Sequence, residues 1–186
     1  MRPAAAFAVA HFAVALFAVA LMAVALTAPS SADAQRPGSV PAPAMTIPAF
    51  RFARHDGRLV SNGDLPARKL VLFVFFDPDC DHCKRAVQHM ELARGDYSAA
   101  AVYFVSMENQ EKIDRFVSKY ASRLAAQRNV LFLRDPGGGY MLGFHPIRFP
   151  SLFLYSPDHK LLDYEDNEET LFRISKSMAA FAAGAR

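Results

Sequence analysis

The chain has 186 residues, of which 21 are Lys or Arg, 18 are Asp or Glu and two are Cys. This length fits one domain, and two cysteines exclude both an all-cysteine zinc site and a scaffold built on several disulfides. The net charge of +3 is small and the basic residues are scattered, which argues against a nucleic-acid-binding surface.

The first 34 residues have the features of an export signal. Arg2 precedes a long apolar segment, residues 4–26, and Ala-Asp-Ala at positions 32–34 matches an A-x-A cleavage site. We therefore predict a cleaved signal peptide over residues 1–34 and a folded part in the periplasm or another extracytoplasmic space. The alternative is an uncleaved membrane anchor, because the apolar segment is long enough to span a bilayer.

The region after the leader divides into a linker and a domain. Residues 35–46 are rich in Pro and Ala and predict a linker, so the domain is expected over residues 47–186. Short alternating segments on both sides of the Asp-Gly dipeptide at positions 56–57 predict a β-hairpin at the start of the domain.

Two runs of seven apolar residues, 70–76 and 99–105, predict strands that are buried on both faces, as in a parallel sheet. Apolar residues at helical spacing between the runs predict a helix that closes at Gly95, and the three elements together form a βαβ unit. A second amphipathic helix is expected over residues 113–124.

The remaining elements complete an α/β domain. A short strand is expected at residues 130–133, followed at 135–139 by a glycine-rich loop without a helix start. Residues 151–155 and 160–164 flank a turn and predict a second hairpin, and residues 168–183 predict a closing helix. The expected fold is an α/β domain with a mixed sheet of about five strands and helices on both faces.

Both cysteines lie where the first buried strand ends and a helix begins, and we expect Asp77 to cap that helix with Pro78 at its first position. At a helix start, free backbone N–H groups and the helix dipole stabilise the thiolate of Cys80. Cys83, most of a turn later, should face the protein. One exposed nucleophile and one resolving thiol are what thiol–disulfide exchange requires. A purely structural disulfide is disfavoured, because so short a loop gains little stabilisation.

These features resemble the thioredoxin-like proteins of the bacterial envelope, redoxins of the TlpA and ResA type, over residues 47–172. The resemblance rests on the segments IPAFRFARHDGRLVSNGDL, KLVLFVFFDPDCDHCK and GFHPIRFPSLFLYSPDHKLL and on a strand–helix–strand insertion. It implies an oxidoreductase that needs no cofactor. The implied partners are cysteine-containing proteins and an envelope electron donor or acceptor. By the same resemblance Pro150 is a cis-proline near the cysteines, and Phe149 and Pro150 bind the substrate.

The chain also departs from this family at the site. Asp79 stands where the family usually has Trp, and Val74 stands where many members carry a buried acid or Asn, so a proton relay through that position is absent. A protonated His82 would stabilise the Cys80 thiolate, whereas Asp79 and Asp81 act in the opposite direction. The sequence therefore leaves open whether the protein is a reductase or an oxidase.

The residues around the motif argue against two other functions. A peroxiredoxin typically has Thr three residues before its cysteine, where this chain has Asp77, and haem attachment would require His where Lys84 stands. The family's loop carboxylate matches Glu108 only with imperfect spacing, so Glu108 is not included among the expected catalytic residues. The alternative from another class is a non-catalytic thioredoxin-fold module in which Cys80, Cys83 and a histidine bind a metal or partner. We expect no metal at the site.

Overall fold

A computed structural model describes residues 41–184. The predicted signal peptide and residues 35–40 of the predicted linker lie outside the described residues. None of the described helices is both long and apolar enough to cross a membrane.

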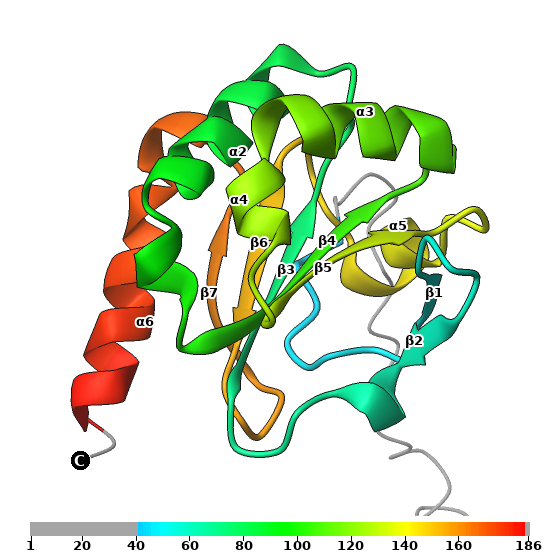
Figure 1. The fold of residues 1–186 in the computed structure, drawn as a ribbon. Coiled ribbons are helices and arrows are strands. Elements are labelled where there is room, and N and C mark those ends of the chain that lie inside the picture. The colour runs from blue at the N-terminus through cyan, green and yellow to red at the C-terminus, as the bar shows by residue number, and fades with distance from the viewer. Residues whose placement is uncertain (1–40, 185–186) are drawn as a thin grey trace, which may run out of the picture. The chain divides into compact units, whose positions relative to one another are not determined.

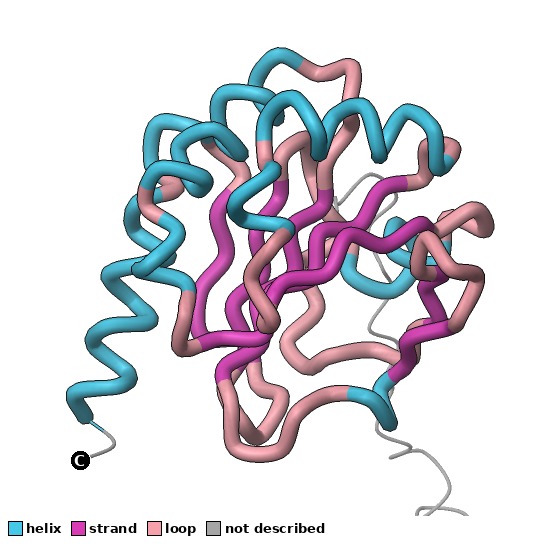
Figure 2. The backbone as a smooth tube through the Cα atoms, in the orientation of Figure 1, coloured by secondary structure: helices cyan, strands magenta, loops and turns pink. Residues whose placement is uncertain are grey.

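Seven strands form one mixed sheet in the order β2-β1-β5-β4-β3-β6-β7 (Figures 1 and 2). The strands are β1 (Arg51–Ala53), β2 (Leu59–Ser61), β3 (Leu70–Phe75), β4 (Ala100–Ser106), β5 (Val130–Arg134), β6 (Ser151–Tyr155) and β7 (Leu161–Glu165). β3, β4 and β5 run parallel, and β6 is antiparallel to β3. The carboxyl ends of the three parallel strands therefore lie at the same edge of the sheet as the amino end of β6.

The strand count differs from the expected five because the first hairpin joins the same sheet. β1 pairs with β2, as predicted, and is also antiparallel to β5, with Ala53 opposite Arg134. Without this hairpin, β5 would be an edge strand with unpaired backbone groups, and pairing with β1 satisfies part of that edge.

Helices cover both faces of the sheet, as predicted. They are α2 (Asp81–Leu92), α3 (Gln110–Tyr120), α4 (Ser122–Ala125), α5 (Gly139–Phe144) and α6 (Phe172–Gly184), with short 3-10 turns η1 (Asn62–Asp64), η2 (Arg94–Tyr97) and η3 (Glu168–Thr170). Alternate side chains of β3 point to opposite faces. Leu72 and Val74 belong to the core under α2, α3, α4 and α6, whereas Phe73 and Phe75 belong to the core under α5 and the first hairpin. Figure 1 shows α6 beside β7 and α5 on the side of β1 and β2.

The helix predicted over residues 113–124 is interrupted. It forms α3 and the short α4, with a break at Ala121. The side chain of Asn109 caps the start of α3, and Glu91 of α2 accepts the backbone N–H groups of Arg123 and Leu124 at the start of α4. The second cap comes from a distant element, so the local pattern of apolar residues could not reveal the break.

The glycine-rich loop was expected to lead into no helix, but it ends at α5. Asp135 is buried and its carboxylate accepts the backbone N–H of Tyr140 at 2.6 Å. Gly138, which precedes the helix, has a φ of +67°, a conformation that favours glycine. The usual capping position therefore has no side chain, and an acid three residues earlier supplies the acceptor.

The end of the predicted linker is bound to the domain. Thr46 forms an isolated bridge with Lys160, and the carbonyl of Met45 accepts the N–H of Leu161. The hydroxyl of Tyr155 donates to the carbonyl of Ala44 at 3.0 Å. These contacts join residues 44–46 to the domain, whose predicted start is residue 47.

Candidate active site

The two cysteines occupy the start of α2, as their spacing predicts. Cys80 is the residue that caps the helix and is half-buried, and its carbonyl accepts the first helical N–H, from Lys84. Cys83 lies in the first turn and is completely buried in the core under α2. Both are free thiols in this structure. One sulfur can therefore meet a partner from solvent, and the other is covered by the protein.

The environment of Cys83 keeps its thiol protonated. Burial raises the pKa of Cys83 well above its usual range, and the neighbouring Cys80 and the charge of Asp77 raise it further. One contact acts in the opposite direction: the backbone N–H of Asp77 donates to Sγ of Cys83 at 3.4 Å. Cys83 is therefore a poor nucleophile until a base removes its proton.

The prediction that Asp77 caps α2 is wrong. The helix begins at Asp81, and the carboxylate of Asp77 accepts the N–H of Asp79 at 2.8 Å instead. The carbonyl of Asp77 accepts the N–H of Cys80, so the segment forms a turn between β3 and the helix. Asp77 thus shapes the loop before Cys80 and lies against Cys83.

The two aspartates beside Cys80 are each paired with a lysine. Asp79 lies 2.7 Å from Nζ of Lys112, and Asp81 lies 2.8 Å from Nζ of Lys84. The hydrogen bonds from these ammonium groups lower the pKa of both carboxyls. Each negative charge next to Cys80 is therefore accompanied by a positive one, which weakens the opposition to a thiolate that the sequence implied.

His82 is exposed and belongs to a cluster that the sequence did not single out. Its Nδ1 lies 3.1 Å from Oε2 of Glu168 and 3.0 Å from Nη2 of Arg85. Arg85 can only donate, so Nδ1 accepts from Arg85 when it carries no proton and donates to Glu168 when it carries one. The choice of hydrogen bond therefore depends on the tautomer and the charge of His82.

The segment before β6 brings the two expected substrate-binding residues to the same edge of the sheet. The Phe149–Pro150 peptide bond is cis, as the resemblance implies. The half-buried ring of Phe149 packs on Phe75, with 4.9 Å between ring centroids. Since Phe75 ends the strand that leads to Cys80, Phe149 is anchored at the carboxyl edge of β3.

Exposed apolar side chains accompany these residues. They lie on the loop after β4, on α5 and on the segment before β6, and they are Met107, Met141, Leu142 and Ile147. The loop after β4 and the segment before β6 lie at the edge of the sheet that carries Cys80, whereas α5 covers one face of the sheet. Exposed apolar residues near a site are typical of protein-binding surfaces. In the sequence, the one signal for these four residues is that they lie outside the apolar segments predicted to form the core.

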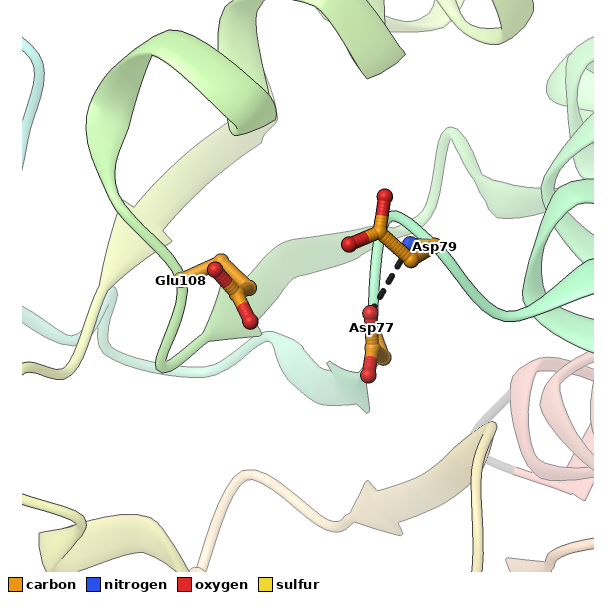
Figure 3. Close-up of side chains that lie close together, drawn as sticks. All are labelled: Asp77, Asp79 and Glu108. Atoms are coloured by element: carbon orange, nitrogen blue, oxygen red, sulfur yellow. Dashed lines mark hydrogen bonds between the residues drawn. The ribbon is translucent and has the colours of Figure 1, made fainter.

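Glu108, which is not among the expected catalytic residues, lies next to the cysteine loop. Figure 3 shows its carboxylate on the segment after β4, facing Asp77 and Asp79 at the end of β3, and ligand atoms of the three lie within 4.8 Å of one another. Nζ of Lys112 lies 3.0 Å from Glu108 and also binds Asp79. Such a cluster has the oxygen donors of a cation site. Here an ammonium group already supplies a positive charge.

Comparisons with known proteins agree with this fold. A sequence model described as the AhpC/TSA family matches residues 41–162. No curated protein matches the chain in sequence. A protein assigned as a thioredoxin from Neisseria meningitidis is 20% identical, with a TM-score of 0.60 over 74% of this chain and 89% of that one.

Two structures from Mycobacterium tuberculosis are similar as well. A secreted disulfide oxidoreductase homologous to DsbE of E. coli is 19% identical, with a TM-score of 0.56 over 70% of this chain and 95% of that one. The peroxidoxin BcpB is 16% identical, with a TM-score of 0.59 over 76% of this chain and 96% of that one. At such identities these structures establish the thioredoxin-like fold and nothing about the chemistry.

Proposed function

Because the chain belongs to the AhpC/TSA family of thioredoxin-like oxidoreductases, we propose that it exchanges disulfides with protein partners through Cys80 and Cys83. The observation that carries the proposal is the unequal exposure of the two thiols: Cys80 is accessible at the start of α2, and Cys83 is fully buried one turn behind it. Helix N-termini stabilise thiolates, which makes Cys80 the nucleophile.

The proposed reaction has two steps. The Cys80 thiolate attacks a disulfide of the partner, a mixed disulfide forms, and one partner sulfur leaves as a thiolate. Cys83 then attacks Sγ of Cys80, the Cys80–Cys83 disulfide forms, and the second partner sulfur is released. The partner is reduced by two electrons and the cysteine pair is oxidised. The same steps in reverse oxidise a partner dithiol, and neither direction uses a cofactor.

Neighbouring residues adjust and extend this site. We assign tuning of Cys80 to His82, Asp79 and Asp81, because their charges lie on both sides of the nucleophile in the loop and first turn. We assign contact with the partner chain to Phe149 and Pro150. The exposed apolar side chains of Met107 and Ile147, on segments at the same edge, support a protein partner, since they offer it a surface to bury.

We further propose that the protein acts outside the cytoplasm. The support is the leader-like sequence of residues 1–34, followed by a linker to residue 46 and the thioredoxin-like domain over 47–186. A structural neighbour described as secreted agrees with this. The partners would then be exported cysteine-containing proteins and an envelope electron donor or acceptor. Contact with the membrane arises only if the leader stays uncleaved.

Two variants test the exchange reaction. Replacing Cys80 by Ser should abolish disulfide exchange, because the accessible nucleophile is lost. Cys83→Ser should instead accumulate mixed disulfides through Cys80, visible as adducts that a reducing agent removes. Equilibration with glutathione buffers then gives the direction: a potential near or below about −230 mV indicates a reductase, and one near about −120 to −180 mV an oxidase or isomerase.

The same experiment addresses the non-catalytic alternative. Among the described residues, no grouping of three metal-ligand side chains includes either cysteine. A metal-binding module would be indicated if Cys83→Ser trapped no partner and the wild type purified with stoichiometric zinc or copper. That outcome would overturn the enzymatic proposal.

A further inference from the structure

The second step of the proposed reaction needs a base. Only a thiolate attacks a disulfide efficiently, and the thiol of Cys83 is completely buried, with a pKa raised by that burial. Val74, at the position where related proteins often carry an acid, is itself only 1% exposed and part of the apolar core. Val74 therefore cannot take the proton of Cys83.

We propose that Asp77 accepts this proton, an inference that rests on the proposed function. The backbone N–H of Asp77 contacts Sγ of Cys83 at 3.4 Å. The carboxylate of the same residue also acts on this thiol, since its negative charge contributes to the raised pKa of Cys83. In the proposal it takes the proton directly or through one water molecule. Asp77 is half-buried and lies just after β3, in the turn that leads to Cys80.

The groups around Asp77 single it out within its cluster. Figure 3 shows it with Asp79 and Glu108, and Lys112 binds both of these neighbours, at 2.7 and 3.0 Å. Within residues 41–184, no Lys, Arg or His lies within ion-pair distance of Asp77. A carboxylate paired with an ammonium group loses that attraction when it is protonated. Proton uptake by Asp77 therefore disrupts no ion pair among the described residues.

The step balances in charge and electrons. The proton of the Cys83 thiol passes to the Asp77 carboxylate, and the electron pair left on Sγ forms the bond to Sγ of Cys80. The bond between Cys80 and the partner breaks, and the partner sulfur leaves with that electron pair and takes a proton from Asp77 or from water. The negative charge moves from carboxylate to sulfur, so two negative charges never face each other. Meanwhile the Asp77 N–H stabilises the forming thiolate.

The test separates the two steps in the reduced full-length chain. With 5,5′-dithiobis(2-nitrobenzoate), attack by Cys80 releases one chromophoric thiolate and closure by Cys83 releases the second, and stopped-flow absorbance resolves both. Asp77→Asn keeps an oxygen acceptor for the N–H of Asp79 and keeps the backbone N–H, but removes the base. We expect the second phase to slow by about 100-fold near neutral pH, the usual range for loss of a general base, with the first phase changed far less.

The pH profile gives a second readout. The second phase of the wild type should be nearly flat between about pH 6 and 8, whereas that of Asp77→Asn should rise about tenfold per pH unit as hydroxide replaces the base. Glu108→Gln is the matched control, since it removes one carboxylate from the same cluster, and its second phase should stay close to that of the wild type.

Distinct outcomes overturn the inference and the proposed function. If the rate of the second phase is the same in Asp77→Asn and Glu108→Gln, Asp77 is not the proton acceptor. If Asp77→Asn does not fold, the pH profile of the wild type serves as the test. A second phase whose rate already rises tenfold per pH unit in the wild type rejects the inference. If the wild type releases fewer than two equivalents, the cysteine pair does not close, and the proposed function fails instead.

Discussion

Arg85 of α2 binds Glu168 across 83 residues of sequence, with three hydrogen bonds of 2.9 to 3.1 Å to its carboxylate. The same carboxylate lies 3.1 Å from Nδ1 of His82, within the cysteine motif. Glu168 belongs to η3, between β7 and α6. The C-terminal part of the domain is thereby joined to the helix that carries both cysteines.

This contact predicts a pH dependence of stability. The hydrogen bonds from Arg85, and then His82, lower the pKa of Glu168 from its ordinary value of 4.5. A carboxyl group with a lowered folded-state pKa stabilises the fold fully above the unfolded value, and this contribution is lost as pH falls through the lower folded value. An NMR titration should therefore place the midpoint of Glu168 below 4.5.

Arg85→Gln provides the comparison. It should move the midpoint of Glu168 back toward its ordinary value. In denaturant titrations the variant should be less stable than the wild type near neutral pH and equal to it at low pH, where Glu168 is protonated in both. If the midpoint of Glu168 is the same in Arg85→Gln as in the wild type, Arg85 does not bind Glu168 in solution.

The unequal environments of the two thiols predict selective alkylation. Cys80 is half-buried, whereas Cys83 is completely buried and its pKa is raised. Iodoacetamide at neutral pH should modify Cys80 of the reduced, folded protein and leave Cys83 unmodified, because alkylation requires an accessible thiolate. Peptide mass spectrometry after a timed reaction reports both sites. In denaturant both should react, and equal labelling of the folded protein would disprove this arrangement.

The ion pair of Asp79 with Lys112 should influence the nucleophile. Removing the lysine charge by Lys112→Gln leaves the carboxylates of Asp79 and Glu108 uncompensated near Cys80. Since this pair is exposed, we expect only about a threefold slower alkylation of Cys80. Lys176→Gln, on α6, removes the same charge elsewhere and should leave the rate unchanged. Equal rates in all three proteins would show that Lys112 does not act on Cys80.

Asp135 should contribute to the stability of α5. Its buried carboxylate accepts the N–H of Tyr140 at 2.6 Å, in the place of a helix cap. Asp135→Ala leaves that N–H without a partner and should lower the free energy of unfolding by about 1–2 kcal/mol. Asp135→Asn keeps an acceptor and should cost less. Urea denaturation of the three proteins measures both effects, and a neutral Asp135→Ala would refute the capping role.

Much of the fold could be predicted because its signals are local. Two continuous apolar runs became the central parallel strands β3 and β4, and helical spacing between them became α2. Both hairpins form where turn residues separate short strands. The break before α4 and the start of α5 were missed, because the groups that cap them come from Glu91 on another helix and from Asp135 in the preceding loop.

The sequence by itself determined the placement of Cys80 and Cys83 at the start of a helix after a buried strand, since apolar periodicity and the spacing of the motif fix both. Only the tertiary structure decided which charges surround them. Lys112 reaches Asp79 from 33 residues away, and Glu168 reaches His82 from the far end of the domain. Exposed charged residues carry no periodic signal. Their partners are set by how β3, β4 and the helices pack, and this packing places loops that are distant in the chain at one edge of the sheet.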